Sequence, residues 1–272
     1  MSDASRSDLP ASETFAGKFA QHIRVVRALI RRDIRSRYAR TSGGFLWAIG
    51  EPALMIMLLA FVFSFLLKTP PIGETFIEFK MTGFLAYFLF RQPSNTGAGG
   101  INYNLGLMSF PAVTPYDAVV ARFYIEFLTV LASTLAINML VYGYYGRLPE
   151  FRVEYLMLCI ALTFGLVSGV SFVNAVLFWR YPSYERIYSA ATRPLLILSG
   201  VLYLPDQRLP SVALDVLWWN PLIHTVAIFR QGYYPTYNPD FISYEYLIFW
   251  IILLNAVGLS LITYHRYSVL ER

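Results

Sequence analysis

Four ionisable side chains interrupt the long apolar stretches of this sequence: Glu51, Arg91, Glu126 and Arg193. A charge inside a bilayer costs about 2.5–3.5 kcal/mol on insertion scales, so such residues usually face a helix-bundle interior or a water-filled path. Arg91 begins a polar stretch that contains Pro93, where it would suit an anion passing through the protein. Glu51 fits water at the membrane rim equally well, and Arg193 fits the headgroup region.

The residues that would carry catalysis are not arranged for it. Gly17-Lys18 lacks the upstream glycine and the following Ser or Thr of a phosphate-binding loop, so ATP hydrolysis by that route is not expected. The three histidines lack metal-ligand spacing, the single Cys159 lies in an apolar run, and no nucleophile signature is present. We therefore expect no catalytic residue, no metal and no cofactor bound by this chain.

The composition indicates an integral membrane protein. The chain has 272 residues, of which 56% are hydrophobic and only 14% charged, whereas a soluble domain carries about a quarter charged residues. Aromatic residues reach 17%, which suggests an aromatic-lined path as well as interfacial anchors. The net charge of +5 comes from basic residues beside apolar segments, so nucleic acid is not an expected partner.

Residues 19–41 form the most basic part of the chain. An apolar stripe recurs at spacings of three and four: Phe19, Ile23, Val26, Ile30 and Ile34. Arginines follow the same period about a third of a turn away: Arg24, Arg27, Arg31 and Arg35. Such a helix lies in the headgroup plane. It could be a juxtamembrane segment that only sets topology; the more specific hypothesis is an interface helix that binds a soluble partner.

Six apolar stretches are expected to span the membrane: 45–68, 79–103, 117–145, 153–179, 187–205 and 244–264. The second is ambiguous: a helix kinked at Pro93 and a re-entrant hairpin both fit, and the charge pattern favours the crossing. In the fourth, Gly165 and Gly169 predict a face that another helix approaches closely. Between the last two spans, residues 206–243 are expected to form short re-entrant or interfacial helices.

The loop charges predict the orientation. The N-terminus, the 180–186 connection and the 265–272 tail carry arginine without matching acid, so both chain ends are expected in the cytoplasm. Residues 1–18 are polar, are expected to be a disordered tail and lack the pattern of a signal peptide. The predicted fold is therefore an all-α integral membrane protein with six transmembrane helices, an N-terminal amphipathic interface helix and short gate helices.

The energy source is expected to lie outside the chain. Ion coupling needs a relay of carboxylates or histidines near the bilayer midplane, and Glu126 alone does not provide one. Six spans, no motor and a docking-type basic helix favour a permease that another subunit energises. The Thr41-Ser42-Gly43-Gly44 segment would then be the hinge between the interface helix and the first span.

Three motifs occur in order along the chain. The first motif is Arg-Asp-Ile-Arg-Ser-Arg-Tyr at 32–38, followed by Ser-Gly-Gly-Phe-Leu-Trp at 42–47 and Pro52. The second motif is Arg-Pro-Leu at 193–195, followed by Ser-Gly-Val-Leu-Tyr at 199–203. The third motif is Asn-Pro at 220–221, followed by Phe-Arg at 229–230. With these motifs the chain resembles permease subunits of type-2 ABC polysaccharide exporters, most of all the KpsM-type capsule permeases. Gly43 departs from the pattern, which usually has a bulkier apolar residue there.

The resemblance implies a homodimer with two ATP-binding cassette subunits, which bind ATP and Mg²⁺ on the cytoplasmic side. Residues 19–41 and the 104–116 loop would contact the ATPase through Arg31, Arg32, Asp33, Arg35, Arg37, Tyr38, Phe110, Pro111, Pro115 and Tyr116. Candidate translocation-path residues are Trp47, Glu51, Tyr87, Arg91, Glu126 and Arg193. Candidate gate residues are Trp218, Trp219, Asn220, Pro221 and Arg230.

The implied activity is export of a lipid-linked anionic capsular polysaccharide across the bacterial inner membrane. The polymer would pass to a periplasmic co-polymerase and outer-membrane export proteins. Export of another lipid-linked glycan, such as O-antigen or teichoic acid, is the nearest alternative. A membrane-embedded glycosyl- or acyltransferase would need a carboxylate or histidine pair at one membrane face, and the sequence does not indicate one. The second motif disfavours a drug-efflux permease.

Overall fold

The computed structural model describes residues 15–38, 44–66, 69–110, 112–146 and 148–270, and every regular element in those ranges is helical. The elements in chain order are α1 (Phe15–Tyr38), α2 (Gly44–Leu66), α3 (Phe76–Ala98), α4 (Gly100–Asn104), the 3₁₀ turn η1 (Leu105–Leu107), α5 (Pro115–Tyr145), α6 (Val153–Arg180), α7 (Pro182–Thr192), α8 (Leu195–Leu198), α9 (Pro205–Arg208), α10 (Ser211–Trp218), α11 (Pro221–Tyr233) and α12 (Tyr244–Leu270). The expected tail at 1–14 and most of the expected hinge, residues 41–43, lie outside the described residues.

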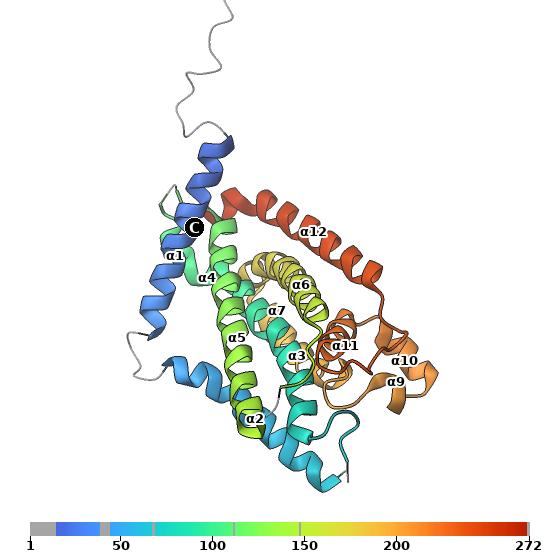
Figure 1. Cartoon of the computed structure of the whole chain (residues 1–272). Helices are drawn as coiled ribbons and strands as arrows, with labels where there is room; N and C mark the ends of the chain where they lie inside the picture. The colour runs from blue at the N-terminus through green and yellow to red at the C-terminus, as the bar shows by residue number, and fades with distance from the viewer. Residues whose placement is uncertain (1–14, 39–43, 67–68, 111, 147, 271–272) are drawn as a thin grey trace, which may run out of the picture.

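Helix α3 lies at the centre of the bundle and packs against α2, α5, α6 and α11 (Figure 1). It starts at a capping box, in which Thr75 and Glu78 each accept a hydrogen bond from the other's backbone N–H. Residues 78–90 are all buried. The helix runs through Pro93 to Ala98 without a break, so a re-entrant hairpin does not describe this segment. Its 23 residues cover about 34 Å, enough for the hydrocarbon core.

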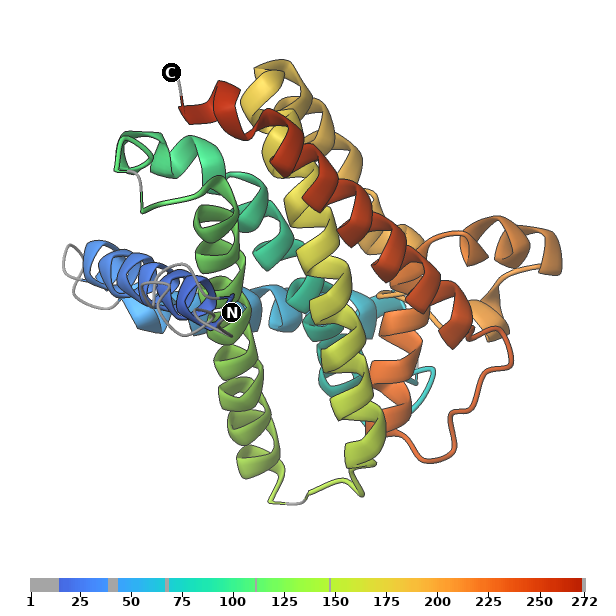
Figure 2. The same ribbon diagram turned by 90° about the horizontal axis from the view of Figure 1, so that it is seen from above.

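Among the described residues, the most extensive helix pairing joins α6 to α12, which lie side by side in Figures 1 and 2. A Cβ atom on Gly165 would be 2.9 Å from Ile251, and one on Gly169 would be 2.7 Å from Leu254. Ser168 donates to Asn255 Oδ1 at 2.9 Å, and Asn255 Nδ2 donates to the Gly165 carbonyl at 3.0 Å. The predicted small-residue face is therefore confirmed, because only glycine permits this approach.

Four helices are long and apolar enough to cross a membrane: Ile49–Leu66, Pro115–Tyr145, Val153–Arg180 and Tyr244–Arg266. The bent pair Ser211–Trp218 and Pro221–Tyr233 passes the same test only if both helices are taken together. The described residues thus form a multi-pass membrane protein with four or five apolar spans. The expected six-span count is not confirmed, because α3 is too polar to be counted and α7, with 11 residues, is too short.

The expected fifth span, 187–205, is not one continuous helix. Helix α7 begins earlier, at Pro182, and ends at Thr192; α8 covers only Leu195–Leu198. The break falls at Arg193-Pro194, where proline removes a backbone donor and its ring crowds the preceding turn. After α8 the chain turns at Gly200, whose φ of 71° is in the left-handed region.

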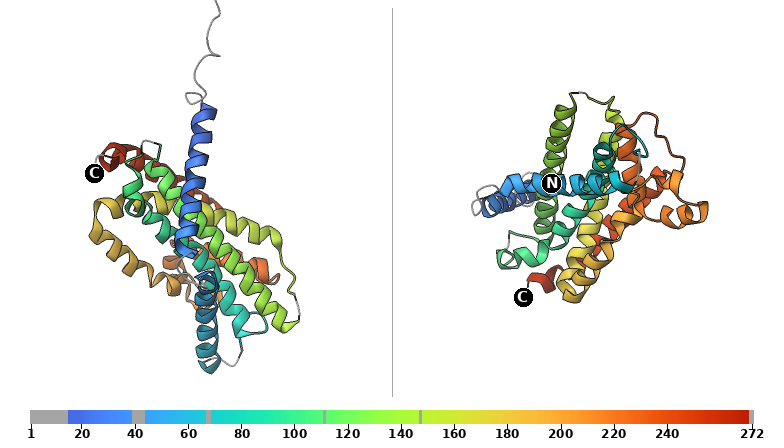
Figure 3. Two further views of the ribbon diagram at one scale, coloured as in Figure 1. Left: turned by 90° about the vertical axis from the view of Figure 1, so that its left-hand side faces the viewer. Right: turned by 90° about the horizontal axis from the view of Figure 1, so that it is seen from below.

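The connections sort to two ends of the bundle. In Figure 2 the η1 region, the α6–α7 connection and the C-terminal end lie toward one end. The α5–α6 and α11–α12 connections lie toward the other end. Helix α1 packs mainly on α5, and its first turns project beyond the bundle (Figure 3).

Candidate functional site

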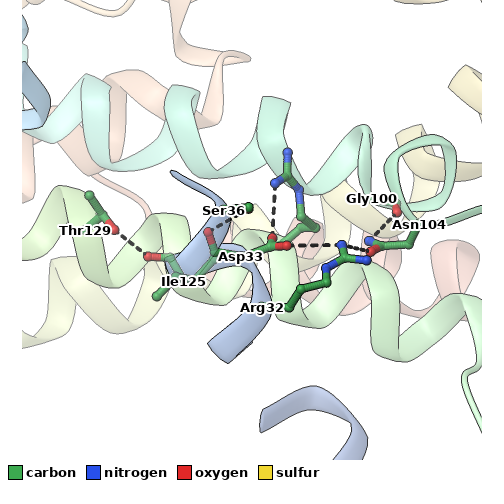
Figure 4. A network of polar contacts seen from close by, with 8 residues as sticks. Arg32, Asp33, Ser36, Gly100, Asn104, Ile125 and Thr129 are labelled. Atoms are coloured by element: carbon green, nitrogen blue, oxygen red, sulfur yellow. Dashed lines mark hydrogen bonds and ion pairs between the residues drawn. The ribbon is translucent and has the colours of Figure 1, made fainter. Parts of the chain in front are cut away.

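Helix α1 is docked on the bundle through a buried carboxylate. Asp33 is only 2% exposed. Its Oδ2 accepts a hydrogen bond from Arg122 Nη1 of α5 at 3.1 Å, and its Oδ1 accepts one from Arg32 Nη2 at 3.2 Å (Figure 4). A buried carboxylate is tolerated only when its charge and its lone pairs are matched in this way. Asp33 therefore fixes the register between α1 and α5.

The same network reaches the 104–116 loop. Arg32 Nη2 donates to Asn104 Oδ1 at 2.6 Å, and Asn104 Nδ2 donates to the Gly100 carbonyl at 2.9 Å (Figure 4). The guanidinium of Arg122 lies 3.9 Å from the centroid of the Tyr103 ring, a cation–π distance. Helices α1, α4 and α5 therefore meet at the start of the 104–116 loop.

A second anchor lies at the N-terminus of α5. Thr114 and Asp117 form a capping box, and Pro115 occupies the first helical turn. Asp117 is fully buried, and its Oδ1 lies 2.7 Å from His22 Nδ1 of α1. Its Oδ2 accepts from Thr114 Oγ1 at 2.7 Å. The cap that ends the 104–116 loop is therefore also a contact for the interface helix.

Helix α1 has three separate faces. His22, Leu29 and Asp33 lie on the face that packs against the bundle. The predicted apolar stripe is about a quarter of a turn away and is partly exposed, with Phe19 at 59%. The arginines of the third face are exposed: Arg24, Arg27, Arg31 and Arg35. An exposed apolar face suits lipid, and an exposed arginine face suits a partner or headgroups.

The predicted ATPase-coupling residues therefore fall into an exposed group and a buried group. Arg31, Arg35, Phe110 and Tyr116 are exposed, as contact with another subunit requires. Asp33 and Pro115 are buried, and Arg32 is half-buried, so these three organise the site from within. The position of Asp33, four residues after Leu29 in a helix otherwise rich in arginine, was the signal for a packing face. Pro111 and the side chains of Arg37 and Tyr38 lie outside the described residues.

The predicted translocation-path residues are distributed over several helices. Trp47 and Glu51 are exposed on α2, Glu126 is buried on α5, and Arg193 is exposed between α7 and α8. Tyr87 is buried on α3 and donates to the Thr192 carbonyl at 3.0 Å, which brings α3 next to the Arg193 break. Arg91 lies one turn after Tyr87 and is half-buried.

The predicted gate residues surround a sharp bend. Helices α10 and α11 meet at 103°. Asn220 caps α11 by accepting from Leu222 N at 3.0 Å, and its Nδ2 donates to Ser199 Oγ at 3.0 Å. Pro221 takes the first helical position, where its missing N–H costs nothing. Trp218 Nε1 donates to the Phe241 carbonyl at 2.9 Å.

Hydrogen bonds from two tyrosine hydroxyls hold other parts of the predicted gate segment, residues 206–243. Trp219 is exposed, and its carbonyl accepts from Tyr246 Oη at 2.5 Å. Between α11 and α12, Tyr237 Oη donates to Asp206 Oδ1 at 3.1 Å. Burial raises the pKa of Tyr237 above its ordinary value, and the Asp206 carboxylate adds to the rise. The phenol therefore stays neutral and keeps its hydrogen bond to Asp206.

Arg230 connects two of the sequence motifs. This predicted gate residue is fully buried in α11. Its guanidinium donates to the carbonyls of Gly200 at 2.7 Å, Val201 at 2.8 Å and Tyr203 at 3.0 Å. The Ser-Gly-Val-Leu-Tyr and Asn-Pro…Phe-Arg motifs thus form one unit, joined at one end by Asn220 and at the other by Arg230.

A multi-pass membrane protein with a docked amphipathic helix and a bent helix pair, of which α11 is buried, has the features of a membrane permease. The family model described as "ABC-2 type transporter" matches residues 24–234. The chain belongs to the ABC-2 type transporter family.

Several curated proteins are similar to this chain over most of their length. The polysialic acid transport protein KpsM of Escherichia coli is 29% identical over 87% of this chain and 91% of its own. The capsule polysaccharide export inner-membrane protein BexB of Haemophilus influenzae is 27% identical over 92% and 94%. CtrC of Neisseria meningitidis serogroup B, which carries the same description as BexB, is 25% identical over 88% and 90%.

Proposed function

We propose that this chain is the transmembrane permease subunit of an ATP-driven transporter that exports lipid-linked capsular polysaccharide across the bacterial inner membrane. The carrying observation is that capsule-export permeases match the chain along nearly its whole length, at 25–29% identity. The O-antigen permease RfbA of Klebsiella pneumoniae is 24% identical over 89% of the chain. Export of O-antigen is therefore the second candidate.

The proposed energy source is a pair of ATP-binding cassette subunits on the cytoplasmic side of a permease homodimer. The exposed Arg31 and Arg35 offer a charged contact for an ATPase, and the exposed Phe110 offers an apolar one. ATPase closure would press on α1 and on the 104–116 loop together, because the Arg32–Asn104 bond joins them. ATP and Mg²⁺ would stay on the partner, and this chain would need no cofactor of its own.

We further propose six crossings, with both chain ends in the cytoplasm. Helix α3 would be the second crossing and the α7–α8 pair a broken fifth crossing. Support comes from the length of α3 and from its complete burial between 78 and 90, which shields Glu78 and Lys80 from lipid. The excess of arginine at the N-terminus and the 180–186 connection supports the orientation.

The proposed cargo path lies along the dimer seam. The exposed Trp47 offers an aromatic face for sugar rings, and Arg91 a cation for an anionic polymer. The 206–243 segment would close the periplasmic end, where a co-polymerase and an outer-membrane exporter would receive the polymer. Movement of a long polymer needs many weak contacts rather than one tight site, because tight binding would stall each step.

The test is deletion of the gene and complementation in the source bacterium, with surface capsule measured by antibody and intracellular polysaccharide by extraction. We expect surface capsule to disappear and polymer to accumulate inside the cell. Lipopolysaccharide gels run on the same strain separate the two candidates. Loss of the O-antigen ladder with intact capsule would replace the first proposal by the second; no change in either would refute both.

A further inference from the structure

The backbone between α8 and α9 is not helical, although it lies deep in the protein. Ser199, Gly200, Val201 and Leu204 are buried, and the chain turns at Gly200 with its positive φ. Backbone carbonyls in a low-dielectric interior need hydrogen-bond donors, which a helix would otherwise supply. The donors that serve this segment identify what holds it in place.

Two cations supply these donors, from two different helices. Arg230 of α11 donates to the carbonyls of Gly200, Val201 and Tyr203 at 2.7–3.0 Å. Lys80 Nζ of α3 donates to the one in between, the Leu202 carbonyl, at 2.7 Å. Four consecutive carbonyls are thus bound by two side chains. We name residues 200–203 together with Lys80 and Arg230 the carbonyl clamp.

Both cations of the carbonyl clamp are fully buried, at 0% exposure. An ammonium or guanidinium is tolerated there only when its N–H groups are bonded and its charge is compensated. Carbonyl dipoles turned toward it provide part of that compensation. Aromatic rings provide more: Lys80 Nζ lies 3.3 Å from the Phe63 ring centroid, and the Arg230 guanidinium lies 4.5 Å from that of Phe79.

Space for the carbonyl clamp comes from a glycine in α3. A Cβ atom on Gly83 would lie 2.5 Å from the Val201 carbonyl oxygen and 2.7 Å from Arg230 Nη2. No side chain fits between α3 and the clamped backbone. The clamp therefore depends on a cation from each of two helices and on the missing side chain of Gly83.

We propose that Lys80 and Arg230 are positioning residues of the gate segment: they hold the 200–203 backbone against α3 and α11, so that it moves with those helices as one body. Residues 200–203 connect the break at Arg193-Pro194 to α9 and α10. A displacement of α3 would therefore reach the gate segment through hydrogen bonds rather than through a loose linker. The effect on export rests on the proposed function; the effect on the backbone does not.

The experiment reads both effects on the permease–ATPase complex in lipid nanodiscs. Cys159, the single native cysteine, is replaced by Ala, and a nitroxide spin label is placed at Tyr203→Cys. In a separate variant, the label is placed at Leu148→Cys, exposed on the α5–α6 connection. This label reports whether a substitution loosens the whole protein. The variants are Lys80→Met, Lys80→Arg and, as the matched control, Arg208→Met at an exposed cation of α9. Capsule export is measured in cells with the same substitutions and without labels.

We expect Lys80→Met to mobilise the label at 203 but not the label at 148, and to lower export at least tenfold with the ATPase still bound. Lys80→Arg keeps a hydrogen-bond donor, so it should partly restore the immobility of the label at 203 and partly restore export. Arg208→Met should change neither the mobility of the label nor export. An immobile label at 203 in Lys80→Met would overturn the clamp. A mobile label with normal export would overturn its role in transport and leave the proposed function standing.

Two outcomes can be interpreted even if the Lys80→Met variant does not fold. A label at 203 that is already mobile in the otherwise wild-type chain would by itself overturn the clamp. If the unlabelled wild-type gene failed to restore capsule to the deletion strain, the proposed function would fail, while the mobility result would still decide the clamp.

Discussion

Asp33 of α1 and Arg122 of α5 form an ion pair across the join between the amphipathic helix and the bundle, with 3.1 Å between Oδ2 and Nη1. Both side chains are largely shielded, at 2% and 13% exposure. A pair this far from water is strongly destabilised by the loss of one partner, because the remaining charge is buried alone. The pair is therefore expected to be a main contribution to the docking of α1, beside the contact of His22 with Asp117.

Replacing Asp33 by Asn should release α1. The amide keeps the shape but removes the charge that compensates Arg122, at a cost of about 3–5 kcal/mol for a buried pair. We expect a lower thermal transition of the detergent-solubilised permease and weaker co-purification of the ATPase. The control is Asp215→Asn, at an exposed carboxylate of α10. Equal stability of Asp33→Asn and wild type would show that the pair does not dock α1.

Charge reversal at Arg31 and Arg35 should act on the partner and not on the fold. Both side chains are exposed on the face of α1 that is turned away from Asp33. The double variant Arg31→Glu, Arg35→Glu should insert into the membrane and melt like wild type, yet retain several-fold less ATPase in a pull-down. Reversal at Arg208, which is exposed on α9, is the matched control. Undiminished ATPase in the pull-down would leave α1 with a role in topology alone.

Gly83→Ala should destabilise the protein, against the general preference of helices for alanine. In an exposed helix interior the change gains about 1 kcal/mol. At residue 83 the new Cβ would displace the Val201 carbonyl or Arg230, and overpacking costs about 1–3 kcal/mol. Gly143 of α5 offers the control, because a Cβ there meets nothing within 4 Å. A melting temperature for Gly83→Ala at or above that of Gly143→Ala would contradict the expectation.

Arg91→Ala should impair export of an anionic polymer while the complex still assembles. Arg91 is half-buried on α3, so a cation there can face a path without being locked in the core. The measurement is surface capsule per cell, with ATPase co-purification as the check on assembly. Arg91→Lys should keep much of the activity, since the charge is what the polymer would sense. Normal capsule in Arg91→Ala would exclude Arg91 from the path.

The sequence predicted an all-helical membrane protein because apolar helices are local patterns; the helix caps are local too, although they were not predicted. Thr75 with Glu78, and Thr114 with Asp117, are capping boxes readable from spacing alone. The glycine pair of α6 was likewise readable, since its partner helix needs only to be apolar. In each case the residues that decide the structure lie within a few positions of one another.

The sequence did not predict which buried charges belong to the core. A hydropathy count treats Lys80 and Arg230 as penalties, because it does not include the carbonyls of residues 200–203 that bind them. The Leu202 carbonyl is 122 residues from Lys80 along the chain, and the Gly200 carbonyl is 30 residues from Arg230. The same limit explains why the second and fifth spans were hardest to define. Their polar groups are matched by distant segments or by a break in the helix.

The separation of the three faces of α1 has a consequence for how such transporters diversify. Contacts to the bundle rest on Asp33 and His22, whereas Arg24, Arg27, Arg31 and Arg35 face outward and take no part in those bonds. Substitutions on the arginine face can therefore accumulate without loss of the fold. If the arginine face binds the ATPase, as proposed, pairing between permease and ATPase can be re-specified there, and chimeras that exchange only the outward residues should accept the ATPase of another transporter.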